Sequence, residues 1–218
     1  MKAAVLVFPG SNCDRDLGES LVRFFSCQVQ YIWHKESFFA EHDIYFLPGG
    51  FSYGDYLRSG ALAAHTRSMS SLREAVAKGR MVVGICNGFQ ILTESKLLPG
   101  ALLRNKSLKH ICKDVPLKGE NEFQDAPNGF SLPISHSEGN YIAPYEILQE
   151  IEENRQVLFR YRENPNGSLH DIAGLCDKSR RVIGLMPHPE RALFPTKDKR
   201  EDMPLFGRYF FEKIFSLL

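Results

Sequence analysis

The sequence has few cysteines and no metal-binding arrangement of them. Its five cysteines are an odd number with irregular spacing, and no CxxC pair occurs. These absences argue against a disulfide framework and against a zinc knuckle. We therefore expect a reducing, cytoplasmic setting, no bound metal, and a chemical role for at most one or two thiols.

Long apolar runs and an excess of one charge are also missing. The first apolar run, in "MKAAVLVFPGSNCD", is too short for a secretory signal or a membrane span and instead predicts a buried strand. The 27 basic and 26 acidic residues are interspersed and leave a formal net charge of +1. Without a basic surface or a membrane segment, we expect no nucleic-acid partner and no membrane association.

Phosphate-binding loops are a third absence. The sequence contains neither a GK[ST] loop nor a G-x-G-x-x-G turn, so no cofactor is expected on this chain. It also has no internal repeat, low-complexity tract or Pro/Ser-rich linker. We therefore expect one domain over residues 1–218.

What the sequence does contain is an alternation of buried strands and amphipathic helices. Apolar runs typical of strands buried on both faces of a parallel sheet lie at residues 3–8, 29–33, 44–47 and 81–85. Between and after them the pattern predicts helices, one capped by Ser11 or Asn12 and another ended by Gly79. This alternation predicts an α/β fold, a three-layer arrangement with an open, largely parallel sheet flanked by helices.

The C-terminal half has a different sequence pattern. From about residue 100, short β-like pieces are separated by Pro, Gly and Asn turns, which predicts added short strands. The final stretch "PLFGRYFFEKIFSLL", residues 204–218, predicts an amphipathic helix. Its Phe206, Phe210 and Ile214 are expected in the core.

A thiol occupies a sharp bend in "VVGICNGFQIL", residues 82–92. Gly84-Ile85-Cys86-Asn87-Gly88 has the form G-x-C-x-G between a strand and a helix, which is a nucleophile elbow with sulfur in place of a serine oxygen. The start of a helix favours a thiolate, and the next backbone N–H would face the same space as an oxyanion donor. We interpret Cys86 as a nucleophile rather than a small buried cysteine.

A nucleophilic cysteine needs a base, and the base needs a group to orient it. His188 follows an apolar strand in "GLMPHPE", at the strand end where an open parallel sheet places its ligand crevice. Glu190, two residues later, could hold the imidazole in one tautomer. By contrast, His42 and His170 have the sequence surroundings of surface histidines.

The glycine-rich loop "LPGGFSYGDY", residues 47–56, also follows a strand. With Gly49, Gly50 and Gly54 it can turn backbone amides toward the same crevice, as a second oxyanion donor. The alternative is a plain flexible turn.

The segments "PGG", "GICNGFQ" and "PHPE", in this order, resemble the class I glutamine amidotransferases, which use a Cys-His-Glu triad. Within that family the resemblance extends over nearly the whole chain to the glutaminase subunits of phosphoribosylformylglycinamidine synthase. The segments "PGGFSYGDYLRSGA", "RNKSLKHIC", "SHSEGNY" and "MPHPERA" carry this closer resemblance. One departure is "HSEG", where the family pattern has "HGEG".

The resemblance implies a flavodoxin-like fold and a role for each matched position. Cys86 is similar to the nucleophile, His188 to the base that later acts as an acid, and Glu190 to the group that orients it. The backbone oxyanion hole would consist of Asn87 with either Gly50 or Phe51.

The resemblance also implies a glutamine pocket. Gln90 lies one helical turn after Cys86 and is similar to a side chain that holds the substrate, although it could equally face solvent. His136, Ser137 and Glu138 belong to the segment that would contact the α-amino and α-carboxylate groups of glutamine. Ser137, which replaces the expected glycine, would narrow this pocket or reach a polar group of the substrate.

The implied activity is hydrolysis of L-glutamine to glutamate and ammonia. The ammonia would pass to a separate large synthetase subunit that uses ATP and Mg to convert formylglycinamide ribonucleotide to formylglycinamidine ribonucleotide in purine biosynthesis. A small bridging subunit is the third expected partner. The alternatives are a glutaminase of another pathway, a cysteine hydrolase of the intracellular-protease type, and a non-catalytic binding subunit.

Overall fold

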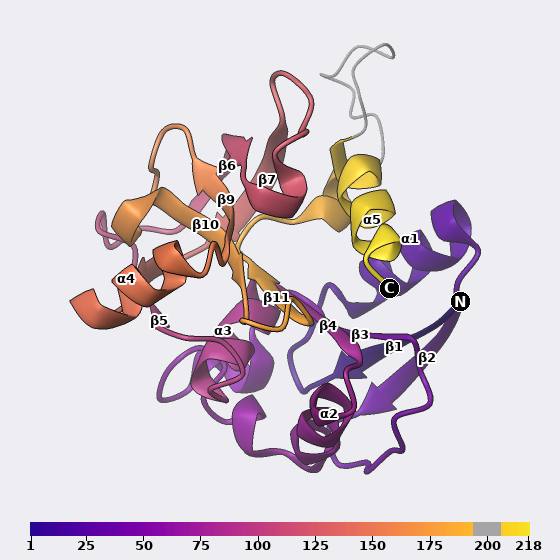
Figure 1. The fold of residues 1–218 in the computed structure, drawn as a ribbon. Helices are drawn as coiled ribbons and strands as arrows, with labels where there is room; N and C mark the ends of the chain where they lie inside the picture. The colour runs from indigo at the N-terminus through magenta and orange to yellow at the C-terminus, as the bar shows by residue number, and fades with distance from the viewer. Residues whose placement is uncertain (194–205) are drawn as a thin grey trace.

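The computed structural model describes residues 1–193 and 206–218, and its centre is a mixed sheet (Figure 1). Within the described residues the sheet has nine strands in the order β2-β1-β3-β4-β11-β10-β9-β6-β7. The parallel half consists of β2 (Gln28–Trp33), β1 (Lys2–Val7), β3 (Ile44–Leu47), β4 (Met81–Ile85) and β11 (Val182–Leu185). The register pairs Gly184 with Gly84 and Leu185 with Ile85, so β4 and β11 end side by side.

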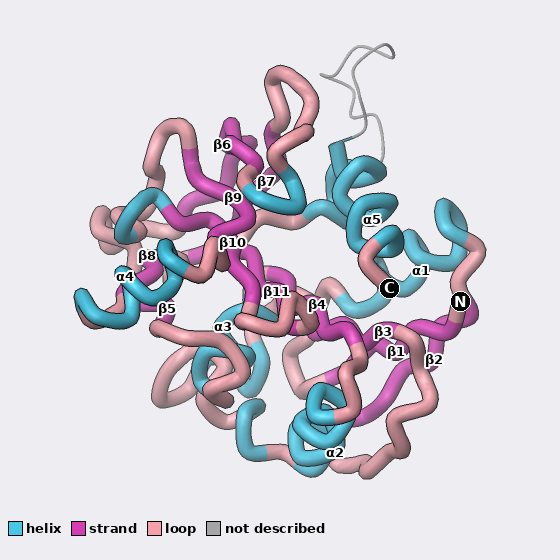
Figure 2. Tube along the Cα trace, viewed as in Figure 1, coloured by secondary structure: helices cyan, strands magenta, loops and turns pink. Residues whose placement is uncertain are grey.

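Beyond β11 the sheet continues with antiparallel strands, which fill the part of the molecule away from β1 and β2 (Figure 2). These strands are β10 (Ile172–Cys176), β9 (Val157–Tyr161), β6 (Ile111–Gly119) and β7 (Ser131–His136). A separate two-stranded sheet pairs β5 (Ala101–Leu103) with β8 (Asn140–Ile142). The helix α4 (Tyr145–Glu153) leads from this pair to β9.

Helices cover both faces of the parallel half. Figure 1 shows α1 (Asp14–Phe25) and α5 (Phe206–Ser216) on one face, and α2 (Arg67–Ala77) and α3 (Asn87–Glu94) on the other. All three predicted core residues of the last helix, Phe206, Phe210 and Ile214, are buried. Phe210 stacks on Phe123 with ring centroids 5.7 Å apart, which joins α5 to the antiparallel half.

Most of the strands and helices expected from the sequence are present, and the α/β prediction is confirmed. The predicted cap of the first helix is wrong, because α1 begins after Cys13 without a side-chain cap. Ser11 instead accepts a hydrogen bond from the Phe8 amide, 3.2 Å away, and closes the turn after β1. Two residues of the expected last helix, Pro204 and Leu205, lie outside the described residues. No helix in the described part of the chain is long and apolar enough to cross a membrane.

Candidate active site

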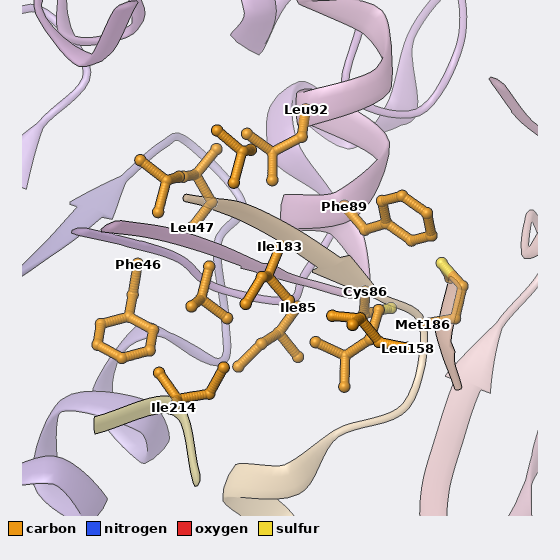
Figure 3. Close-up of a cluster of buried hydrophobic side chains, with 14 of the residues drawn as sticks. Phe46, Leu47, Ile85, Cys86, Phe89, Leu92, Leu158, Ile183, Met186 and Ile214 are labelled. Atoms are coloured by element: carbon orange, nitrogen blue, oxygen red, sulfur yellow. The ribbon is translucent and has the colours of Figure 1, made fainter. Parts of the chain in front are cut away.

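Cys86 lies at a strained bend between β4 and α3. Its φ of 51° and ψ of −106° place a non-glycine residue where L side chains are rarely found. A Cβ on Gly88 would lie 2.0 Å from the Leu47 carbonyl oxygen, and one on Gly84 would lie 2.6 Å from the Gly88 carbonyl oxygen. Both flanking glycines are therefore needed for the chain to pass this closely. Figure 3 shows Cys86 in the buried cluster, near Met186 and Leu158.

His188 and Glu190 form a buried pair after β11. The His188 Nδ1 and the Glu190 Oε1 are 2.6 Å apart, and each residue is only 2% exposed. Because Nδ1 is held by the carboxylate, Nε2 is the nitrogen available for chemistry, and it has no hydrogen-bond partner among the described residues. This is the arrangement that the sequence predicted for the base and its orienting group.

The electrostatic surroundings of His188 favour its charged form. Burial alone would lower the pKa of His188, but the charges of Glu190 and Cys86, together with the hydrogen bond to Glu190, raise it to about 10. No thiol hydrogen bond to Nε2 is present in this geometry, yet Cys86 is near enough to contribute to this rise in pKa. The thiol instead points to the Ser135 carbonyl oxygen at 3.8 Å. At neutral pH the imidazole of His188 is thus protonated and can act as an acid beside the bend at Cys86.

The loop after β3 supplies the wall opposite His188. A Cβ on Gly49 would lie 2.6 Å from His188 Cε1, so only glycine leaves room for the imidazole. Gly50 has a φ of +141°, and a Cβ there would lie 2.7 Å from both the Asn12 nitrogen and the Gly10 carbonyl oxygen. A side chain at either glycine of "PGG" would therefore clash with its surroundings, and at Gly49 the clash would be with His188.

The two alternative loop amides of the oxyanion hole differ in availability. The Phe51 amide donates to the Gly10 carbonyl oxygen at 2.9 Å, so it is already engaged. The amides of Gly50 and Asn87 have no protein acceptor among the described residues. Gly50 and Asn87 therefore keep backbone amides that are not engaged within the described residues, whereas Phe51 does not.

The side chain of Asn87 connects the elbow to the glycine-rich loop. Its Oδ1 accepts from the Ser52 amide at 3.1 Å, and its Nδ2 donates to Gln90 Oε1 at 2.9 Å. Gln90 in turn donates to the Glu138 carbonyl oxygen at 2.6 Å. Gln90 is 5% exposed, so the solvent-facing alternative for its side chain is wrong. The loop, the elbow and the expected glutamine-binding segment form one hydrogen-bonded unit.

Asn105 holds the segment His136–Gly139 and was not identified from the sequence. Its Oδ1 accepts from His136 Nδ1 and from the Gly139 amide, both at 3.0 Å, and its Nδ2 donates to the His136 carbonyl oxygen at 2.9 Å. Burial, with the neighbouring charge of His188, lowers the pKa of His136 to about 4. His136 is therefore neutral, and its buried Nε2 has no partner among the described residues. Such an atom is an acceptor ready for a substrate N–H.

Ser137 and Glu138 face outward more than the sequence suggested. The Ser137 hydroxyl contacts His110 Nδ1 at 3.1 Å, while His110 Nε2 contacts the Ser135 hydroxyl at 3.1 Å. Ser137 thus joins a bridge to His110, and nothing here places its hydroxyl in the glutamine pocket. The carboxylate of Glu138 accepts from the Ser59 amide at 3.4 Å and lies 3.8 Å from Arg104.

The glycine-rich loop is strained and carries a perturbed acid. Positive φ angles occur at Tyr53 and Asp55 within the loop and at Leu57 directly after it, all non-glycine residues. Burial, assisted by the charge of Glu138 and opposed by a hydrogen bond from Ser59, raises the pKa of Asp55 to about 6. The loop also exposes apolar side chains, with Tyr56 74% and Leu57 89% exposed.

Comparison with known proteins identifies the family of the chain. Residues 1–204 match the CobB/CobQ-like glutamine amidotransferase domain. The chain is similar to the phosphoribosylformylglycinamidine synthase subunit PurQ of Trichormus variabilis, with 47% identity over 224 residues and coverage of 100% of both chains. It is also 50% identical over 202 residues to the PurQ subunit of Leptospira interrogans, covering 89% of this chain and 92% of that relative.

A solved structure supports the same assignment. A chain in the structure of PurLQS from Thermotoga maritima matches with a TM-score of 0.86 and 39% identity, covering 99% of this chain and 98% of that chain. At this identity and coverage the match extends to the family and not only to the fold. The chain therefore belongs to the CobB/CobQ-like glutamine amidotransferase family and, within it, to the PurQ subunits of phosphoribosylformylglycinamidine synthase.

Proposed function

We propose that the chain is the glutaminase subunit of phosphoribosylformylglycinamidine synthase in purine biosynthesis, and that Cys86, His188 and Glu190 perform its reaction. The observation that carries the assignment of residues is the buried His188–Glu190 pair beside a strained cysteine elbow. A protonated imidazole favours a neighbouring thiolate, and Glu190 balances the charge of the imidazolium.

The first half-reaction forms a thioester. The Cys86 sulfur attacks the amide carbon of glutamine, a C–S bond forms, and the carbonyl electrons move to oxygen. The amides of Gly50 and Asn87 donate to this oxyanion. As the oxyanion collapses, the C–N bond breaks, and His188 gives its proton to the departing nitrogen to release ammonia.

The second half-reaction returns the free enzyme. His188, now neutral, accepts a proton from water while the water oxygen attacks the thioester carbon. The C–S bond breaks, the thiolate is restored and glutamate leaves. We assign Gln90 and the segment 136–139 to glutamine binding, with His136 Nε2 as an acceptor and Gln90 held in place by Asn87 and Glu138.

Ammonia release requires a partner. Free ammonia in neutral water is mostly protonated and non-nucleophilic, so the site must open onto a space that excludes water. We propose that the large synthetase subunit supplies this space, binds ATP and Mg, and aminates formylglycinamide ribonucleotide, and that a small third subunit bridges the two. The name PurLQS of the Thermotoga maritima structure supports a three-part assembly of this kind.

The proposal places no cofactor on this chain and places the protein in the cytoplasm. The absence of a phosphate-binding loop motif in the sequence supports the first part. Five free cysteines, several of them buried, support a reducing compartment.

The test separates the two nitrogen donors. Cys86→Ala is assembled with the large subunit, and product formation is measured with glutamine and with ammonium salt at raised pH. Glutamine-dependent synthesis is expected to fall by about a millionfold, because triad members act as a unit. Ammonia-dependent synthesis is expected to persist. Equal loss of both activities in an assembled complex would contradict the proposed division of labour.

A second measurement tests the base. Rapid-quench detection of the γ-glutamyl enzyme compares His188→Asn with His42→Asn and His170→Asn. Only the first is expected to stop thioester formation, because His42 bonds Gln30 and His170 bonds Glu152, away from the elbow. Equal accumulation in all three variants would remove His188 from the mechanism.

A further inference from the structure

A second thiol lies against the catalytic pair. Cys13, the residue before α1, is 2% exposed. Its Sγ, a ring nitrogen of His188 and a carboxylate oxygen of Glu190 all lie within 4.8 Å of one another. The glycine-rich loop closes over them, since a Cβ on Gly49 would be 3.3 Å from the Cys13 sulfur.

The side chain of Arg191 forms a hydrogen bond with the sulfur of this thiol. Its Nη2 donates to Cys13 Sγ at 3.1 Å, and its backbone amide donates to the His188 carbonyl oxygen at 3.2 Å. Burial, with the nearby Glu190, raises the pKa of Cys13 to about 12, so the thiol is neutral. It therefore anchors the guanidinium without cancelling its charge. The same contact argues against a metal site, because a cation would compete with Arg191 for sulfur and with Glu190 for His188 Nδ1.

Glu190 and Arg191 line the same cavity. Its volume is about 410 Å³, and its other lining residues are Asp16, Glu19, Ser20 and Arg23. The Glu190 Oε2 has no hydrogen-bond partner among the described residues. The positive charge of Arg191 interacts with the carboxylates of both Glu190 and Asp16.

We propose that Arg191 is a positioning residue of the triad. Held by the sulfur of Cys13, its guanidinium fixes the turn that carries His188 and Glu190 and keeps a positive charge beside that pair. The inference rests on the proposed glutaminase function. Arg191 acts through the His188–Glu190 pair, because its backbone amide donates to the His188 carbonyl oxygen and its side chain binds Cys13 next to both residues. The titratable and charged groups around Glu190 are Cys13, Asp16, Glu19 and Arg23 from the α1 side, His188 and Arg191 from its own loop, and Cys86 from the elbow.

The test uses four variants of the full chain in the assembled complex. Glutamine hydrolysis is measured from about pH 5.5 to pH 9 for Arg191→Gln, Arg191→Lys, Cys13→Ala and Cys13→Ser. Arg191→Gln is expected to lower kcat about tenfold with KM within about twofold, and to move the acid limb of the kcat/KM profile to higher pH by about half a unit. Arg191→Lys and Cys13→Ser, which keep the cation and the acceptor, are expected to recover most of the activity. Cys13→Ala falls between.

The controls separate positioning from folding. Arg15→Gln removes the same charge from an exposed position of α1 and is expected to leave the profile unchanged. An Arg191→Gln complex with the wild-type kcat and acid limb would overturn the inference. So would a lower kcat without a pH shift and without rescue by lysine, because that pattern indicates a merely structural role. If Arg191→Gln fails to assemble, the two cysteine variants decide. A lower kcat and a shifted acid limb in Cys13→Ala, both restored in Cys13→Ser, would support the inference, and wild-type behaviour of Cys13→Ala would overturn it. A wild-type complex unable to use glutamine would instead contradict the proposed function.

Discussion

Cys86 stores backbone strain that the surrounding fold maintains. A non-glycine residue in this region typically costs about 1–3 kcal/mol. The cost is met by close packing, since Gly84 and Gly88 let β4, α3 and β3 approach within distances that side chains would prevent. The strained bend places the thiol at the N-terminus of α3, where negative charge is favoured.

Gly49 gives a sharp test at the residue scale. Gly49→Ala would put a Cβ 2.6 Å from His188 Cε1, and the imidazole cannot yield freely because Glu190 holds it. We expect kcat for glutamine to fall about 10- to 100-fold with KM nearly unchanged, because a displacement of about 1 Å can cost that much. Steady-state kinetics of the assembled complex check this. Gly79→Ala is the control, since its Cβ position is open and its positive φ of 76° puts backbone strain at a position distant from His188 in the chain; comparable kinetic loss there would contradict the reasoning.

The raised pKa of His188 predicts a pH-dependent stability. The folded pKa of about 10 exceeds the ordinary 6.5, so the His188–Glu190 pair stabilises the fold fully below about pH 6.5 and loses this contribution as pH rises through 10. We expect Glu190→Gln to lower Tm most near pH 6 and least near pH 10, because breaking a buried charge pair costs about 3–5 kcal/mol. Thermal unfolding at both pH values checks this, with the exposed Glu163→Gln as control. A difference that does not change with pH would contradict it.

At the scale of elements, the glycine-rich loop contains an acid, Asp55, whose charged form is disfavoured in the fold, whereas the charged form of His188 is favoured. The pKa of Asp55 is raised to about 6, so its ionised form destabilises the fold above that pH. Asp55→Asn removes the charge and suits the positive φ of 55°. We expect a gain of about 1 kcal/mol at pH 8, discounted for the partial exposure of the side chain. Little gain is expected at pH 4, where the carboxyl is already protonated in the fold. Tm at the two pH values decides, and an equal gain at both would point to backbone strain alone.

The strands and helices of the parallel half were predictable because their pattern is local. The runs at 44–47 and 81–85 coincide with β3 and β4, since strands buried on both faces leave continuous apolar sequence. The strands β6 and β8 and the helix α4 were not predicted. The strand β6 has three consecutive exposed residues and a proline, so it lacks a continuous apolar run.

The site was predictable where a motif carries its own geometry. Cys86 followed from its flanking glycines, and His188 with Glu190 from a strand end. Asn105 and Arg191 could not be found in this way, because their roles depend on partners 31 and 178 residues away in the chain. The choice between Gly50 and Phe51 also required the fold, since the Phe51 amide is engaged by Gly10.

At the scale of the whole molecule, α5 supports the turn Pro189–Ala192, which carries Glu190. A Cβ on Gly207 would lie 2.1 Å from the Pro189 carbonyl oxygen, so the helix rests directly on the 3₁₀ helix Pro189–Ala192. Helix propensity alone would make Gly207→Ala stabilising by about 1 kcal/mol. We expect the reverse, a lower Tm together with a lower kcat, because the loop that carries Glu190 must move.

Phe210→Leu is the matched variant for this prediction. It trims the aromatic cluster that Phe210 forms with Phe123 and Phe159 and leaves Gly207, the residue against the Pro189 carbonyl oxygen, unchanged. It is expected to lower Tm and leave kcat nearly unchanged, as measured by thermal unfolding and glutaminase assay. A Gly207→Ala chain that is more stable and fully active would show that the helix can move away from the loop at no cost.

The adjacency of β4 and β11 has a consequence for protein synthesis. The two strands are neighbours in space, yet 102 positions separate Cys86 from His188 along the chain. A ribosome therefore completes the bend at Cys86 long before it makes His188, and α5, which packs on the turn after His188, follows later still. Until then the nascent polypeptide carries the thiol without the imidazole beside it. Under the proposed mechanism, glutamine in the surrounding medium is not cleaved before His188 has been made and has folded against the thiol.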